Sequence, residues 1–128
     1  LLGRLYLSLS YMVQKISPEG RAGSGYVNGA VEFIRNNFSY DIGVGEIARH
    51  VGIDRTYLYR LFQRHLEQSP KAYLTQVRLG MAAEMLTETE LPVTEIALSC
   101  GFPDVSLFGR HFREAYCCTP LQYRRKKR

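Results

Sequence analysis

Two stretches of the chain repeat one pattern. Residues 47–74 read IARHVGIDRTYLYRLFQRHLEQSPKAYL, and residues 96–124 read IALSCGFPDVSLFGRHFREAYCCTPLQYR. An offset of 49 aligns the first halves and places Gly52 on Gly101, and one extra residue in the second copy then makes the offset 50. The remaining halves share an arginine, a phenylalanine, a proline and a tyrosine at matched positions. The sequence therefore predicts one structural unit that is used twice.

The repeated pattern is typical of a helix-turn-helix unit. In the first copy, a short helix is expected over about residues 44–51, and Gly52 follows where a tight turn needs a positive φ. Asp54 is a good N-cap for a second helix that runs to about Leu66. In a helix-turn-helix unit, the second helix can lie in a major groove of DNA. One copy alone is weak evidence, because many all-helical proteins contain short helix pairs joined by a glycine turn.

A long helix is expected between the two copies. Ser69 followed by Pro70 is typical of a helix start, and the apolar pattern continues to about residue 86. From Tyr26 onward no convincing strand pattern appears. The fold class expected is therefore all-α, with about seven helices: a first unit over about residues 26–68, the long helix over 70–86, and a second unit over about 92–125.

The first 25 residues differ from the rest. Leucines, a methionine and an isoleucine recur over residues 1–16 at steps of three and four, which predicts a helix that packs either on a missing upstream domain or in a dimer seam. Residues 17–25 are rich in glycine and serine and are expected to be a linker. The apolar start is too short to span a membrane and lacks the features of a signal peptide. Because the chain begins at Leu1, we expect a fragment of a longer cytoplasmic protein.

The net charge of +5 does not by itself predict a nucleic-acid partner. Residues 124–128 carry all five charges, whereas residues 26–123 hold nine Lys/Arg against eleven Asp/Glu, a net of −2. The basic tail can contact phosphates without reading sequence, although a solvated, disordered tail is an equal alternative for its last three residues. The positions of individual arginines must therefore carry a DNA-binding interpretation.

The cysteines predict no special chemistry. Cys100, Cys117 and Cys118 form an odd set without a C-x-x-C pair, and the three histidines are not at zinc-ligand spacing from them. Reduced structural thiols are favoured over redox sensing or alkyl-group acceptance. We expect no metal site, no cofactor and no enzymatic activity.

The second helix of each copy has a polar face opposite its buried stripe. Arg60 and Arg110 fall at equivalent positions on these faces, and an arginine fork matches the O6/N7 edge of guanine. Tyr59 and Val105 can make apolar contact with a thymine methyl group. Solvated surface arginines are the alternative, but recurrence at matched sites argues against it. The predicted DNA-binding residues are Arg55, Thr56, Tyr59, Arg60, Gln63, Val105, Ser106, Gly109, Arg110 and Arg113.

Residues 26–125 resemble the AraC/XylS family of bacterial transcription regulators, most clearly in the I-A, G-F, T-P and Y-R motifs of the second copy. The resemblance implies a transcription regulator, commonly an activator, whose two recognition helices enter successive major grooves about 34 Å apart. Double-stranded operator DNA and RNA polymerase are the implied partners. An upstream domain would bind a small-molecule effector, often a sugar, and would dimerise the intact protein; residues 1–25 look like its end.

Two features depart from the family pattern. Glu67 and Cys117 stand where the family usually has glycine, so we expect a less comfortable backbone there. Val105 and Gly109 offer few polar contacts, so the second unit is expected to discriminate bases poorly and to contribute mostly anchoring. The rival function is a helical protein–protein interaction module without sequence-specific DNA binding. An alkyl-transfer repair enzyme is disfavoured, because the cysteine cluster of such proteins is missing.

Overall fold

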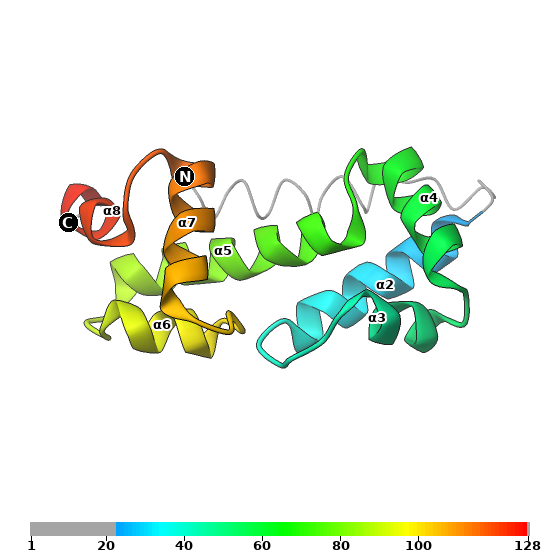
Figure 1. Ribbon diagram of the computed structural model, residues 1–128, viewed down its shortest axis with the longest axis horizontal. Helices are drawn as coiled ribbons and strands as arrows, with labels where there is room; N and C mark the ends of the chain where they lie inside the picture. Colours follow the sequence, from blue (N-terminus) through cyan, green and yellow to red (C-terminus); the bar gives the residue numbers. More distant parts are fainter. Residues whose placement is uncertain (1–22, 128) are drawn as a thin grey trace.

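The computed structural model describes residues 23–127, in which two helical units share one long helix (Figure 1). The helices in this range are α2 (Ser24–Asn37), α3 (Val44–Val51), α4 (Arg55–Leu66), α5 (Pro70–Glu88), α6 (Val93–Ser99), α7 (Val105–Tyr116) and α8 (Pro120–Lys127). They confirm the predicted all-α fold with two helix-turn-helix units around a central helix. The helix predicted over residues 1–16 and the linker up to residue 22 lie outside the described residues. None of the helices between residues 23 and 127 is long and apolar enough to cross a membrane.

Helix α2 begins two residues earlier than predicted. Ser24 and Gly25, expected in the linker, form its first turn, and Ser24 is buried. Gly23 precedes the helix with φ of 88°, and a Cβ atom there would overlap the side chain of Leu61 on α4. The chain therefore enters α2 through a close contact with α4 that only glycine fits. This contact is tertiary, so local sequence signals did not reveal it.

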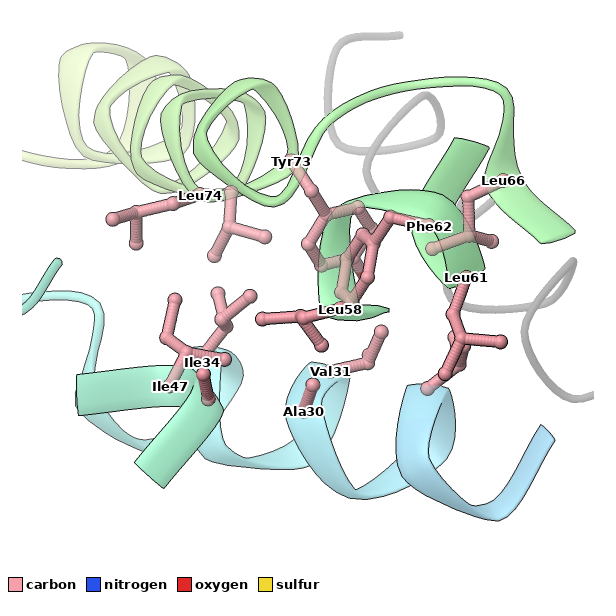
Figure 2. Close-up of a cluster of buried hydrophobic side chains, with 13 residues drawn as sticks. Ala30, Val31, Ile34, Ile47, Leu58, Leu61, Phe62, Leu66, Tyr73 and Leu74 are labelled. Carbon is pink, nitrogen blue, oxygen red and sulfur yellow. The ribbon is translucent and has the colours of Figure 1, made fainter. Parts of the chain in front are cut away.

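The first hydrophobic core lies where α2, α3, α4 and the start of α5 meet (Figure 2). The apolar side of α2 lines one side of this core, with Val31 and Ile34 facing Leu58 of α4. Phe62 and Tyr73 pack edge to face, with ring centroids 6.0 Å apart. The buried members of this core are Val27, Ala30, Val31, Ile34, Ile47, Ala48, Leu58, Leu61, Phe62, Leu66, Tyr73, Leu74 and Val77.

The second core repeats this arrangement around the other half of α5. Its centre is a group of aromatic rings: Phe108 contacts Phe112, and Phe112 packs edge to face on Tyr123 of α8 at 5.5 Å between centroids. Its buried members are Leu79, Ala82, Ala83, Leu86, Ile96, Ala97, Cys100, Phe102, Phe108, Phe112, Cys118 and Tyr123. Residues 73–77 of α5 thus belong to the first core and residues 79–86 to the second.

The two helix-turn-helix turns have the predicted chemistry. Gly52 and Gly101 adopt positive φ angles of 86° and 95°. Asp54 accepts a hydrogen bond from the backbone N–H of Tyr57 at 2.8 Å, and Asp104 accepts one from Leu107 at 2.7 Å. Such N-caps typically contribute about 1 kcal/mol each, and they fix where each second helix starts.

Strained backbone occurs at the two predicted positions. Glu67 and Cys117 end α4 and α7 with φ angles of 58° and 62°, and they are the non-glycine residues with positive φ in residues 23–127. In this left-handed region a side chain crowds its own backbone. Both helices therefore end in a backbone conformation that glycine adopts more readily, which confirms the unfavourable backbone expected at these two residues.

Substitution of either residue by glycine should stabilise the domain. Relief of left-handed strain exceeds the added entropy of an unfolded glycine, so Glu67→Gly or Cys117→Gly should raise the free energy of unfolding by about 1 kcal/mol. The measurement is the urea midpoint by circular dichroism. Gln68→Gly is the control and should lower the midpoint, because Gln68 has no positive φ to relieve. Equal or lower midpoints for both strained positions would contradict the expectation.

Candidate nucleic-acid interface

Helix α4 presents the polar face predicted for the first unit. Its apolar side chains, including Leu58 and Phe62, are buried in the first core. The opposite face is solvent exposed. The large side chain of Tyr59, for example, retains 51% of its accessible surface. The predicted DNA-binding residues on this face, all of them exposed, are Arg55, Thr56, Tyr59, Arg60 and Gln63.

The first of these arginines lies against α3. A Cβ atom at Gly45 would come within 3.2 Å of Nη2 of Arg55, so the guanidinium lies over the first turn of α3. Glu46 is nearby: the Gly43 N–H donates to Oε1 of Glu46 at 2.8 Å and lowers the pKa of that carboxyl, and Arg55 lowers it further. Arg55 is therefore held at the junction of α3 and α4, whereas Arg60 is exposed on the surface of α4.

Helix α7 presents a comparable face with one difference. Ser106, Arg110 and Arg113 are exposed as predicted. Val105 is partly buried and packs against the second core, so its side chain contacts the protein interior and only part of it is accessible to a partner. The repeat aligns Val105 with the exposed Arg55, but such an alignment carries no information about burial.

Gly109 occupies open space in the middle of α7. A Cβ atom there would have no neighbour within 4 Å, so protein packing does not require glycine. Glycine in a helix interior costs about 1 kcal/mol relative to alanine. The result is a shallow spot on the exposed face of α7, between Ser106 and Arg110, where a flat partner can approach the backbone.

Positive charge gathers on the second helices despite the net negative charge of residues 26–123. Helix α4 carries three arginines and no acidic residue, and α7 carries two arginines and Glu114. Acidic residues occur on α5, α6 and the segment between them, at Glu84, Glu88, Glu90 and Glu95. Helices α4 and α7 therefore carry net positive charge, which suits a polyanion there better than the overall charge of residues 26–123 indicates.

The basic C-terminal segment is helical, and one of its arginines is structural. Helix α8 extends to Lys127, so Lys126 and Lys127 are not part of a disordered tail. Arg124, predicted as a phosphate contact, instead donates from Nε to the Leu86 carbonyl at 3.0 Å and from Nη2 to the carbonyls of Thr89 and Leu91. These carbonyls lie at the end of α5, where helical partners run out. Arg125, Lys126 and Lys127 remain exposed.

A second arginine, Arg78, was not singled out from the sequence. It lies on α5 between the two cores and donates from Nε to the Phe38 carbonyl at 2.8 Å and from Nη2 to the Tyr40 carbonyl at 2.9 Å. Like Arg124, it binds carbonyls at the C-terminal end of a helix, here those of Phe38 and Tyr40 at the end of α2. The available signal was an arginine flanked by two apolar residues, Val77 and Leu79, in the predicted long helix.

Two of the three cysteines, Cys100 and Cys118, lie in the protein interior. Cys100 and Cys118 are buried, Cys117 is exposed, and all three are free. Burial raises the pKa of Cys100 to about 11, which keeps this thiol protonated and unreactive at neutral pH.

Known proteins share this arrangement. A family profile described as a helix-turn-helix domain matches residues 47–126. A lactose operon transcription activator of Staphylococcus xylosus is 36% identical over 95 residues, covering 74% of this chain and 34% of that protein. The melibiose operon regulatory protein of Escherichia coli K12 is 30% identical over 100 residues, covering 78% and 33%. The solved C-terminal domain of AraT, a response regulator from Geobacillus stearothermophilus, is 33% identical with a TM-score of 0.78 and 88% coverage of each chain.

These similarities define a class of bacterial transcription regulators that bind DNA through paired helix-turn-helix units, a class of DNA-binding proteins and not of enzymes. Within this class the chain belongs to the AraC/XylS family, as the repeated motifs predicted. The chain spans about a third of the length of the lactose and melibiose regulators.

The different environments of the C-terminal basic residues predict different losses on substitution. Arg125→Gln combined with Lys126→Gln and Lys127→Gln should weaken all duplexes alike and reduce the slope of log affinity against log salt by up to about 3. Arg124→Gln should instead lower the melting temperature, because it leaves the carbonyls of Leu86, Thr89 and Leu91 without this donor. Duplex titrations at several salt concentrations and thermal melts measure the two effects. A salt slope unaffected by the triple substitution would exclude this end of α8 from DNA contact.

Proposed function

We propose that this chain recognises operator DNA by placing α4 and α7 in two successive major grooves on one face of the duplex. The observation that carries the proposal is the equivalence of the two exposed faces, with Arg60 and Arg110 at matched positions on units that share α5. Each arginine can form a bidentate contact with guanine. Thr56, Gln63 and Ser106 add hydrogen-bonding groups on the same faces, and Arg113 can reach a phosphate or a base edge.

The two units are proposed to contribute unequally. The face of α4 offers five exposed candidates, whereas on α7 Val105 is partly buried and Gly109 has no side chain. Fewer side chains can therefore reach base edges from α7. The second unit then supplies mainly backbone anchoring, with Arg110 as its principal base contact, and the shallow spot at Gly109 lets α7 approach the groove closely.

The regulated genes are proposed to form a bacterial operon for carbohydrate use, with activation as the mode of control. This proposal is supported by the names of the lactose operon activator and the melibiose operon regulator, to which the chain is similar. Activation implies contact with RNA polymerase, and regulation implies a small-molecule effector and a homodimer formed through sequence beyond residues 26–128. A regulator of bacterial operons acts in the cytoplasm, where the DNA is.

The proposal predicts a bipartite DNA motif. Enrichment of random duplexes on the purified chain, followed by sequencing, should give two short blocks centred about 10 base pairs apart, because recognition helices on one DNA face are spaced by about one turn. The block read by α4 should carry more information than the block read by α7. Binding without a motif that disappears at moderate salt would contradict the proposal and favour an interaction module whose basic C-terminal end alone holds DNA.

Single arginine substitutions assign each block to its helix. Arg60→Ala should relax base preference at one position of the stronger block and weaken specific binding by roughly 1–3 kcal/mol, and Arg110→Ala should do the same in the other block. Arg35→Ala on α2 is the control, since it removes the same charge away from both faces. An unchanged motif with either variant would remove that arginine from the recognition surface.

A further inference from the structure

The two helix-turn-helix units touch each other beside α5. In Figure 1 the loop between α2 and α3 and the turn between α6 and α7 come together near the middle of the molecule. A Cβ atom at Gly101, in the α6–α7 turn, would overlap the carbonyl oxygen of Phe38 at the end of α2 and would lie 2.7 Å from Nε of Arg78. The turn of the second unit is thus in direct contact with the first unit. We call the group formed by Gly101, Phe38 and Arg78 the inter-unit contact.

Each member of the inter-unit contact is fixed in its own way. Gly101 has φ of 95°, and its N–H donates to the Leu98 carbonyl at 3.1 Å, which holds the turn. Arg78 donates to two carbonyls of the first unit, those of Phe38 and Tyr40, and so ties α5 to the end of α2. Burial lowers the pKa of Arg78 while the charge of Asp41 acts in the opposite direction. The partly buried guanidinium is therefore compensated by fixed oxygen atoms.

Arg78 lies at the boundary between the two cores. Val77 before it is buried in the first core, and Leu79 after it is buried in the second. At this boundary α5 is the covalent link between the units, and a single helix can bend or twist over a turn. A contact that braces the helix at this point has the greatest effect on the relative orientation of α4 and α7.

The equivalent glycine in the first unit makes no such contact. Gly52 adopts nearly the same φ, 86°, but a Cβ atom there would find nothing within 4 Å. Arg124 donates to carbonyls at the end of α5, those of Leu86, Thr89 and Leu91, although the repeat aligns it with Leu74 and not with Arg78. Gly101 and Arg78 therefore join one unit to the other, whereas Gly52 makes no such contact and Arg124 acts within the second unit.

We propose that the inter-unit contact sets the spacing and rotational phase of the two DNA blocks that the chain accepts, so that Gly101 and Arg78 are specificity-determining residues that do not touch DNA. The inference rests on the proposed two-groove binding. Adding one base pair between the blocks moves one of them by about 3.4 Å and rotates it by about 35° relative to the other. When the inter-unit contact holds the two units rigidly, they cannot follow this displacement and the altered duplex binds more weakly. When the contact is disrupted, the units can shift and the loss of affinity is smaller.

The test compares Gly101→Ala with Gly52→Ala on duplexes that carry the enriched blocks at the native spacing and with one base pair added or removed. Both variants place alanine at a positive φ, so they share the backbone strain, but only Gly101→Ala disrupts the inter-unit contact. The unmodified chain and Gly52→Ala should bind altered spacings about tenfold more weakly than the native one, since the DNA must deform to fit. For Gly101→Ala the penalty should fall to about threefold or less, with base preferences inside each block retained.

A second pair of variants tests the inference even if Gly101→Ala does not fold. Arg78→Lys keeps the charge but loses the forked donor that reaches two carbonyls, and Arg124→Lys makes the same change within the second unit. Arg78→Lys should relax the spacing preference, and Arg124→Lys should not, when thermal melts show that both are folded. Spacing penalties for Gly101→Ala and Arg78→Lys equal to those of their controls would overturn the inference. Absence of a bipartite motif with the unmodified chain would instead contradict the proposed function.

Discussion

Both hydrophobic cores depend on burial of opposite ends of one helix. Tyr73, Leu74 and Val77 of α5 close the first core, and Leu79 and Leu86 close the second, with Arg78 alone between the two sets. Removal of these side chains from water is the main stabilising term available to units of about fifty residues, each too small to bury a large core alone. The positions of α4 and α7 therefore follow from how each packs against its own end of α5.

Features that depend on local chemistry could be predicted from the sequence. Ser69 with Pro70, and the aspartates before α4 and α7, act on backbone groups within three residues, so their meaning does not depend on the rest of the fold. The unusual backbone at Glu67 and Cys117 was expected on other grounds, because these residues stand where the AraC/XylS family usually has glycine. The repeat predicted the arrangement of two helix-turn-helix units around one long helix. The exposure of Arg60 and Arg110 follows from helical periodicity.

Features that depend on contacts across the fold could not be predicted in this way. Arg124 belongs to a run of five basic residues, and only the position of α5 reveals that three carbonyls occupy its guanidinium. Val105 aligns with an exposed arginine but packs on the second core. Gly23 at the start of α2 lies against Leu61 of α4. In each position the deciding atom comes from an element distant in sequence, and neither spacing nor propensity records that proximity.

The shared helix also imposes an order on synthesis. While the chain leaves the ribosome, α2, α3 and α4 emerge before the residues of α5 that complete their core, so the first unit stays partly open until Val77 is available. Once α5 has docked, its far end presents Leu79, Ala82, Ala83 and Leu86 as an apolar template before α6 exists. The order of synthesis thus gives the second unit an apolar surface to pack on, so the two copies of one motif meet different surroundings in a growing chain.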